Sequence, residues 1–390
     1  MGVCWSGRGT RRPPSHDHHE GPGPRVVYLG GLGRSGTTLL ERLLAARPGV
    51  CAAGETVHLW QRGLVRNELC GCGLPFTACP FWRRVGEHAF GGWAEIDPGR
   101  VTRLAASVDR SRYIPRLAAP LPGLARRPAL AEYTSYYQRV YAGLAAASGC
   151  EVLIDSSKHP SLAFCLRWID PLRIRVVHVV RDSRAVAYSW TRLIRRPDAV
   201  AARACPEVPG RSGSGHPAPG WQGGGGAHGG AMGDDGNAAR RDAGAREPAR
   251  GLETGPYYLT RYSPAVSAGL WNGHNAAVAL LARCGVPVLR VRYEDLAMDP
   301  AAVLARIAGF AGLPGGAFAG PALGGGPGRW WADLGPAHTV SGNPMRFTTG
   351  QVPITADNRW RTALPAADRR LVTGLTLPLL AGYGYLRGAA

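Results

Sequence analysis

Residues 26–40 read VVYLGGLGRSGTTLL, and this stretch decides the fold. An apolar, strand-forming run at 26–29 enters a glycine-rich turn, and an apolar, helix-forming run follows at 39–44. The backbone N–H groups of such a turn, together with the N-terminus of the following helix, form a binding site for anions. The stretch therefore predicts a phosphate-binding loop between a strand and a helix.

The loop departs from the Walker pattern G-x-x-x-x-G-K-[ST] at one position. Gly31, Gly36 and Thr38 fit the pattern. Thr37 stands where the lysine belongs, and the positive charge lies three places earlier, at Arg34. We therefore expect the loop to hold an anion without the usual lysine for β- and γ-phosphates. The expected contacts are Arg34, Ser35, Gly36, Thr37 and Thr38.

The overall charge favours an anionic small ligand. The 390 residues include 46 Lys and Arg against 27 Asp and Glu, which gives a formal net charge of +19. The basic residues are scattered and no nucleic-acid motif is present, so we expect no nucleic-acid partner. Among them Lys158 is the only lysine. A lone lysine in this background points to a site that needs a compact ammonium, with chance survival as the alternative.

The sequence also bears on location and assembly. No apolar run approaches the roughly 18 residues of a membrane span, and residues 1–24 lack the apolar core of a secretory signal. We therefore expect a cytoplasmic protein. Nothing in the sequence indicates its oligomeric state.

Five nearly continuous apolar runs predict the strands, because such runs suit strands buried on both faces of a parallel sheet. They are residues 26–29, 50–53, 152–154, 174–180 and 286–291. Helical patterns lie between them, as at 38–46 and 133–147. This alternation predicts an α/β fold with a doubly wound, three-layer arrangement.

Two segments are expected to lie outside this fold. Residues 1–24 read as a disordered N-terminal tail. Residues 197–256 contain GRSGSGHPAPGWQGGGGAHGGAMGDDGN, a composition that cannot bury enough apolar surface to fold by itself. We therefore expect a single domain at 25–390 that is interrupted by a disordered, Gly-rich insertion at about 197–256.

Ligands of open α/β sheets bind at the carboxyl ends of the strands, and several predicted strands here end in polar residues. The strand at 174–180 leads to Arg181, and Ser189 follows about two helical turns later, near the same face. A guanidinium and a hydroxyl so placed could grip one phosphate. Tyr293 follows the strand at 286–291 and is either a site residue or a core residue. Asp155 follows the strand at 152–154 as a Walker B aspartate would.

Together these motifs resemble sulfotransferases that use 3′-phosphoadenosine 5′-phosphosulfate (PAPS). The loop resembles the family's 5′-phosphosulfate loop, Arg181 and Ser189 resemble its 3′-phosphate element, and Tyr293 resembles its nucleotide-contacting tyrosine. The resemblance covers about 25–60, 150–192, 286–300 and 338–362. It implies a P-loop NTPase-like three-layer sandwich with a central parallel sheet. It also implies sulfuryl transfer to a hydroxyl or amine of a small-molecule, carbohydrate, lipid or peptide acceptor, with no metal.

The resemblance also assigns catalytic roles. Glu55 stands at the spacing of the catalytic base of tyrosylprotein sulfotransferases and related bacterial enzymes, and a carboxylate tuned by burial suits that role. Because the cytosolic small-molecule sulfotransferases use a histidine instead, the rival bases are His58, His159 and His178. Lys158 resembles the lysine that this branch places against the transferring sulfuryl group.

The run HTVSGNPMRFTTG resembles the closing segment of bacterial sulfotransferases. Ser341, Asn343 and Arg346 are expected over the nucleotide, with Ser341 counted among the catalytic residues. The rival function is a P-loop kinase or NTPase that uses Asp155 and Mg²⁺, and the missing Walker lysine argues against it.

Three cysteines cluster in CGCGLPFTACPFW, namely Cys70, Cys72 and Cys79. Three thiols so close could bind a metal, but no fourth ligand lies at a standard spacing. A redox-labile pair or buried thiols are therefore favoured, and no metal site is expected.

Overall fold

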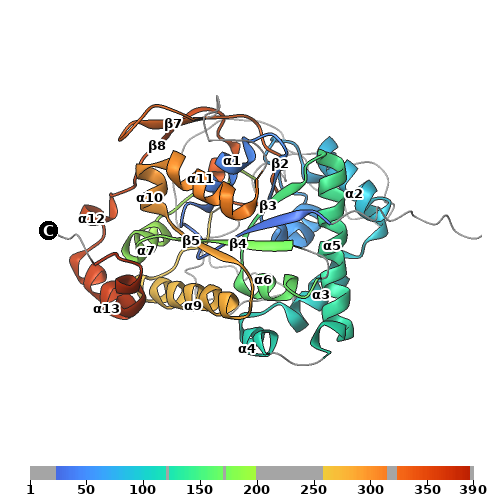
Figure 1. The fold of residues 1–390 in the computed structure, drawn as a ribbon, viewed down its shortest axis with the longest axis horizontal. Coiled ribbons are helices and arrows are strands. Elements are labelled where there is room, and N and C mark those ends of the chain that lie inside the picture. The colour runs from blue at the N-terminus through green and yellow to red at the C-terminus, as the bar shows by residue number, and fades with distance from the viewer. Residues whose placement is uncertain (1–22, 120–122, 170–172, 199–257, 314–322, 387–390) are drawn as a thin grey trace, which may run out of the picture.

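The computed structural model describes residues 23–119, 123–169, 173–198, 258–313 and 323–386 (Figure 1). Its centre is a five-stranded sheet in the order β2-β3-β1-β4-β5, and every pairing is parallel. The strands are β1 Arg25–Gly30, β2 Val50–Gly54, β3 Val152–Lys158, β4 Arg173–Val180 and β5 Val288–Arg292. All five predicted strands are confirmed.

Alternate residues of β1 face two separate cores, which makes the fold a three-layer sandwich. Val26 and Tyr28 pack into the core beneath α5, α6 and α9, whereas Val27 and Leu29 pack into the core beneath α1 and α11. Figure 1 shows α1, α10 and α11 on one side of the sheet and α6 and α9 on the other. Because both faces of β1 are covered, the strand had to be apolar throughout. The predicted three-layer sandwich with a central parallel sheet is confirmed.

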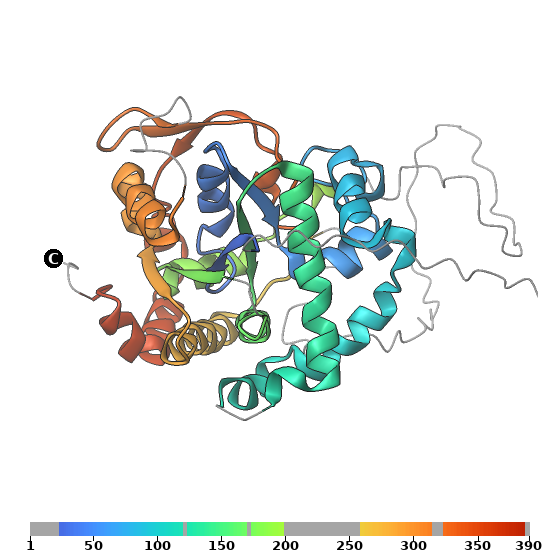
Figure 2. The same ribbon diagram turned by 45° about the vertical axis from the view of Figure 1, so that its right-hand side comes forward.

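The helices of the described ranges begin at proline or at a capping residue in most cases, as expected of helix N-termini. They are α1 Thr37–Ala45, α2 Pro80–Phe90, α3 Pro98–Val108, α4 Ile114–Ala118, α5 Pro128–Ser148, α6 Pro160–Leu166, α7 Ser183–Thr191, α9 Pro264–Arg283, α10 Tyr293–Met298, α11 Pro300–Ala311, α12 Trp360–Ala363 and α13 Ala366–Gly382. Figure 2 shows the long α5 standing beside α2 and α3, with which it shares one core. None of these described helices is long and apolar enough to cross a membrane.

A second sheet was not predicted. Its antiparallel strands are β6 Leu323–Gly324, β7 Trp330–Leu334 and β8 Gly350–Ile354. The chain between β7 and β8 returns to the main sheet, where Val340 forms a parallel bridge with Gly54 at the end of β2. Arg42 of α1 anchors this connection by donating to the carbonyls of Met345 and Gly335 at 3.0 and 2.5 Å. The second sheet therefore delivers residues 339–346 to the edge that carries the predicted site.

Several boundaries differ from the sequence-based expectation: α5 begins at Pro128 instead of 133, and β5 begins at Val288 instead of 286. β3 runs to Lys158 instead of ending at 154, because Ser156 and Ser157 also bond to neighbouring buried groups. Of the expected insertion, Pro197 and Asp198 belong to the described chain, and Asp198 is buried. The remainder of that insertion, and residues 1–22 of the expected tail, lie outside the described residues.

Candidate active site at the carboxyl edge of the sheet

Five of the predicted residues follow the carboxyl ends of the five parallel strands. Glu55, Arg181 and Tyr293 come directly after β2, β4 and β5. Lys158 is the last residue of β3, where it pairs in register with Gly30, and Arg34 lies in the loop after β1. Parallel strands end at the same edge of a sheet, so the predicted groups share one edge.

The N-terminus of α1 is left open to a ligand. Its N-cap Gly36 has φ 87°, no side chain caps the first turn, and the first turn contains no acidic residue. By contrast, Asp182, Ser263 and Asp299 cap α7, α9 and α11. The first N–H groups of a helix need an acceptor and attract negative charge. This terminus is therefore suited to an anion, as the sequence predicts.

Tyr293 forms one wall of the loop. A Cβ added at Gly36 would lie 2.5 Å from the Tyr293 ring, so the ring occupies the space that any other residue at 36 would need. The Tyr293 hydroxyl donates to the carbonyl of Thr355 at 3.1 Å. The close approach and the left-handed φ together require glycine at 36.

Glu55 is the centre of a buried ionic cluster. Lys158 Nζ donates a hydrogen bond to Glu55 Oε1. It also donates to the carbonyl of Ser156 at 2.9 Å. Ser341 Oγ donates to Glu55 Oε2 at 3.4 Å, and His58 Nε2 lies 3.4 Å from the same oxygen. The structure therefore brings together the three predicted catalytic residues, Glu55, Lys158 and Ser341.

The cluster keeps Glu55 ionised. Burial alone would raise the pKa of Glu55, but the charge of Lys158, which is the largest opposing cause, outweighs burial, and the pKa is lowered to about 2. Burial lowers the pKa of His58 to about 3, against the opposing pull of Glu55, so this imidazole is neutral at neutral pH. The carboxylate and the ammonium of Lys158 are then the charged pair of the site.

Strained backbone marks the same residues. Of the non-glycine residues that the structure describes, Arg34, Lys158 and Ser341 have φ of 76°, 68° and 58°, and Asn67 has φ 49°. A left-handed conformation of a residue with a side chain costs about 1–3 kcal/mol and persists where the surroundings enforce it. Such strain is concentrated at functional sites, and three of these four residues were predicted from the sequence as site residues.

Arg181 has an unused donor in the site. Its side chain is buried, and it donates to the carbonyls of Arg34 and Asp357 at 3.1 and 3.3 Å. The guanidinium lies 4.4 Å from the centre of the Tyr293 ring. Its Nε has no hydrogen-bond partner among the described residues. The guanidinium also pairs with Asp357, at 3.6 Å between Nη2 and Oδ2, so its Nε is the atom that could donate to an anionic ligand.

Ser189 lies in the last turn of α7, next to the loop. Its neighbour Trp190 donates from Nε1 to the carbonyl of Gly33 at 3.1 Å. The Arg34 guanidinium stacks on the same indole at 4.9 Å. The C-terminal turn of α7 is thereby fixed against the loop that the sequence predicted to bind phosphate.

The three histidines considered as alternative bases lie in different parts of the structure. His178 is buried within β4, pairs with Asn275 Oδ1 at 2.7 Å, and has a pKa lowered by burial to about 4. Its partner belongs to α9 instead of the ionic cluster, so His178 is not placed to act as the base. His159 begins α6, and its ring lies 5.6 Å from that of His58. His58 therefore lies next to Glu55, and His159 lies next to His58.

Asp155 is buried, and its carboxylate is hydrogen-bonded to other groups of the protein. It is fully buried, and it accepts hydrogen bonds from Tyr141 Oη at 2.6 Å and from the Ser157 backbone N–H at 2.8 Å. The hydroxyls of Thr56 and Ser157 also donate to it. Burial raises its pKa. These contacts hold β3 against its neighbours and give no support to the rival Mg²⁺ site.

Asn343 and Arg346 make contacts within the protein. Arg346 is 1% exposed and donates to the carbonyls of Thr339 and Leu69 at 2.7 and 2.5 Å. Asn343 accepts from the backbone N–H of Met345 at 3.1 Å and caps the short turn that follows. Both residues shape the segment that presents Ser341, and their predicted contact with a nucleotide stays a prediction.

Sequence reasoning missed Arg62. This residue lies in a π-helix, Leu59–Val65, that follows the 3₁₀ turn Thr56–His58. Its guanidinium donates to Ser341 Oγ and to Asp198 Oδ2, the latter at 2.7 Å. The sequence signal that could have identified Arg62 as a site residue was its position about two helical turns after Glu55. Asp198 had none, because it stands at the edge of a Gly-rich segment.

Part of the chain matches the model of a known protein family. Residues 24–69 match the model of the Sulfotransferase family. No curated protein sequence matches the chain. The sulfotransferase domain from the Synechococcus PCC 7002 olefin synthase is similar at 20% identity and a TM-score of 0.39, over 95% of this chain and 98% of that one. Sulfotransferase STF9 from Mycobacterium avium is similar at 13% identity and a TM-score of 0.35, over 76% of this chain and 65% of that one.

The family match covers β1, the loop, α1, β2 and Glu55. It agrees with the resemblance to sulfotransferases that was drawn from the sequence for this part of the chain. The strand–loop–helix–strand unit at residues 24–69 is the part of the chain that matches the model of the Sulfotransferase family.

Proposed function

We propose that this protein transfers a sulfuryl group from PAPS to a hydroxyl or amine acceptor. The observation that carries the proposal is the uncapped N-terminus of α1, which the cations Arg34, Lys158 and Arg181 surround at the carboxyl edge of the sheet. This unit lies in the segment that matches the Sulfotransferase family. An open helix terminus flanked by cations is suited to a multiply charged donor.

The residues present fit a donor with separate 5′ and 3′ charges. The loop N–H groups and Arg34 would hold the 5′-phosphosulfate. Arg181, with its unpaired Nε, and Ser189 would hold the 3′-phosphate. Without the Walker lysine at 37, the loop lacks the group that commonly serves a β,γ-phosphate pair.

Lys158 is placed to change partners. Its flexible four-carbon stem starts at the strand end beside Gly30, and in this structure its ammonium pairs with Glu55. A bound donor offers Lys158 more negative charge than one carboxylate does. If Lys158 turned toward the donor, Glu55 would lose its strongest cation while remaining buried, so the pKa of Glu55 would rise toward the range of a general base.

The transfer then has a role for each residue. Glu55 takes the proton of the acceptor as the acceptor oxygen or nitrogen forms its bond to sulfur. The bond between sulfur and the donor's phosphate oxygen breaks, and the electron pair stays on that oxygen. Lys158 and the loop N–H groups stabilise the charge that develops there. The products are the sulfated acceptor and adenosine 3′,5′-bisphosphate.

The acceptor would approach from the side of the 3₁₀ turn and the π-helix that follow Glu55. His58 and Arg62 in this segment contact the cluster, at 3.4 Å between His58 Nε2 and Glu55 Oε2. Small-molecule, carbohydrate, lipid and peptide acceptors are all compatible with the proposal. A cytoplasmic location is part of it.

Release of 3′,5′-bisphosphate from PAPS tests the proposal, because this product forms whichever acceptor is used, water included. We expect release to be accelerated by the wild-type protein and by the exposed-site control Arg283→Ala, and to be about 10²- to 10³-fold slower in Lys158→Ala. Release no faster than in buffer across hydroxyl and amine acceptors, together with transfer of the γ-phosphoryl group of ATP, would overturn the proposal.

A further inference from the structure

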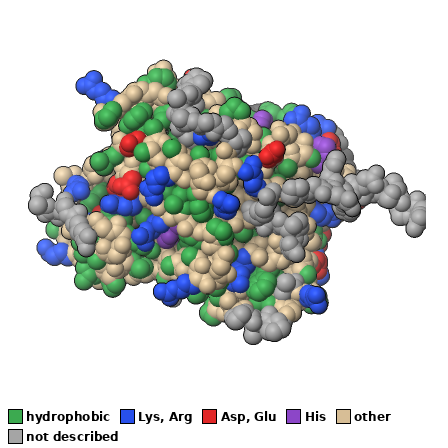
Figure 3. Space-filling model, in the orientation of Figure 1, with side chains coloured by type: hydrophobic (Ala, Val, Ile, Leu, Met, Phe, Trp, Pro, Cys, Tyr) green, Lys and Arg blue, Asp and Glu red, His purple; other side chains and the backbone are tan. Residues whose placement is uncertain are grey.

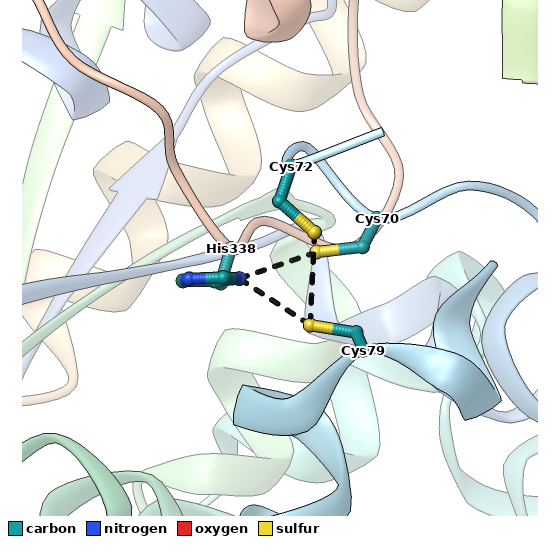
Figure 4. A group of neighbouring side chains, drawn as sticks. All are labelled: Cys70, Cys72, Cys79 and His338. Carbon is teal, nitrogen blue, oxygen red and sulfur yellow. Dashed lines mark hydrogen bonds between the residues drawn. The ribbon is translucent and has the colours of Figure 1, made fainter. Parts of the chain in front are cut away.

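Four potential metal ligands meet beside the candidate active site (Figure 4). They are Cys70, Cys72 and Cys79 from the segment before α2, and His338 from the connection between β7 and β8. His338 and Cys79 are 259 positions apart in the sequence. The four ligand atoms nevertheless all lie within 4.8 Å of one another.

We propose that these four residues form a structural zinc site. A tetrahedral zinc ion with Zn–S of about 2.3 Å and Zn–N of about 2.0 Å has S···S edges of about 3.8 Å and S···N edges of about 3.5 Å. Here Cys72 Sγ and Cys79 Sγ are 3.8 Å apart. His338 Nδ1 lies 3.8 Å from Cys70 Sγ and 3.3 Å from Cys79 Sγ. These three distances are close to the edges of the tetrahedron that zinc needs, and all four ligand atoms lie within 4.8 Å of one another.

The donor set selects the metal. Three thiolates and one imidazole form a closed Cys₃His set, which is typical of structural zinc. Mg²⁺ and Ca²⁺ require oxygen ligands, and the group contains none. The three cysteines are free thiols instead of a disulfide. Cys70 and Cys79 are fully buried, so the site is shielded from solvent on one side.

The surroundings orient the ligands as the outer shell of a metal site does. The Cys70 N–H donates to the Leu74 carbonyl at 2.7 Å, which closes a tight turn around Cys72. The imidazole of His338 stacks on the Phe81 ring, with 5.0 Å between centroids.

The site would join two distant parts of the chain next to Glu55. Directly after His338, the Thr339 carbonyl accepts from Gly71 N at 3.0 Å, and Val340 N donates to the Ala53 carbonyl at 3.0 Å. The Glu55 N–H donates to the Val340 carbonyl at 2.8 Å. Zinc would therefore fix the segment that presents Ser341 to the carboxylate. This inference rests on the four ligands alone and stands apart from the proposed sulfuryl transfer.

Metal analysis of the purified full chain tests the site. We expect one zinc per chain after dialysis, retained in Cys284→Ser and lost in Cys72→Ser and in His338→Ala. Cys284 is the matched control because its Sγ contacts the Ala118 carbonyl, outside the group. In the wild-type protein, titration with an organomercurial should release the zinc as three thiols react, which requires no variant to fold.

Three results would overturn the inference. One is a wild-type chain, refolded with excess zinc, that carries none after dialysis. The second is full zinc retention in both ligand variants, which would place the metal elsewhere. The third is a disulfide among the three cysteines in the protein as purified under argon, or iron in place of zinc.

Discussion

The ammonium of Lys158 and the carboxylate of Glu55 form a hydrogen-bonded ion pair across the ends of the neighbouring strands β3 and β2. Their side chains are 11% and 14% exposed. Removal of one partner from such a buried pair leaves an uncompensated charge. Lys158 is also the only lysine in the chain. Substitutions at Glu55 and Lys158 therefore test the roles of the carboxylate and of the ammonium separately.

Replacement of the carboxylate tests the base. Glu55→Gln keeps the shape of the side chain and removes its ability to take a proton, so turnover should fall about 10²- to 10⁴-fold. Affinity for 3′,5′-bisphosphate should stay equal or become tighter, because Lys158 no longer has a competing carboxylate. Steady-state kinetics and calorimetry measure the two effects. Unchanged turnover would shift the role of base to His58 or His159.

Replacement of Lys158 tests charge stabilisation. Lys158→Ala should lower turnover about 10²- to 10³-fold if it resembles the loss of an oxyanion-hole donor. Lys158→Arg should rescue only in part, because a planar fork does not occupy the place of a point charge. The comparison uses kcat of the two variants at saturating donor. A fully active Lys158→Arg protein would make the lone lysine an accident of composition.

Arg181 should distinguish the two ends of the donor. Arg181→Ala should weaken binding of 3′,5′-bisphosphate about 10- to 150-fold, the range expected for a hydrogen bond to a charged group. Binding of adenosine 5′-monophosphate, which lacks the 3′-phosphate, should change much less. Arg283→Ala, at the far end of α9, is the control for lost positive charge. An equal loss for both nucleotides would place Arg181 at the 5′ end or in a purely structural role.

The ion pair predicts a pH dependence of stability. The pKa of Glu55 is about 2 in the folded chain against an ordinary 4.5, so the folded state keeps its carboxylate charged where the unfolded chain binds a proton. The stabilisation is fully present above about pH 4.5 and is lost as the pH falls toward 2. Urea unfolding between pH 3 and 6 should therefore show a steeper loss for wild type than for Glu55→Gln. Parallel curves would contradict the lowered pKa, since other acid-labile groups are common to both proteins.

The strands and the edge that carries the site could be predicted from the sequence, because each depends on a local pattern. Runs such as 26–29 are apolar throughout, since β1 faces a core on both sides. Arg34, Lys158 and Arg181 stand where strands end, and parallel strands bring such ends to one edge. The grouping of Ser341 with Glu55 came from the family resemblance, and the structure places the two side chains 3.4 Å apart.

What escaped prediction depends on contacts between distant segments. Asp155 has the pattern of a Walker B aspartate, but Thr56 and Tyr141 enclose it from other elements. The resemblance predicts Arg346 over the nucleotide, but it does not reveal that the Leu69 and Thr339 carbonyls accept hydrogen bonds from this side chain. His338 completes the cysteine group from the far end of the chain, and no local spacing could reveal it.

Ligand-dependent thermal stability tests the central claim most directly, because binding requires no knowledge of the acceptor. Adenosine 3′,5′-bisphosphate, added without Mg²⁺ at about 100 times its dissociation constant, should stabilise the protein by about 2.7 kcal/mol. ATP with Mg²⁺ at the same concentration should stabilise it much less, since the loop lacks the Walker lysine. Strong stabilisation by ATP and Mg²⁺ with none by the bisphosphate would contradict the assignment of this site to PAPS-dependent sulfuryl transfer.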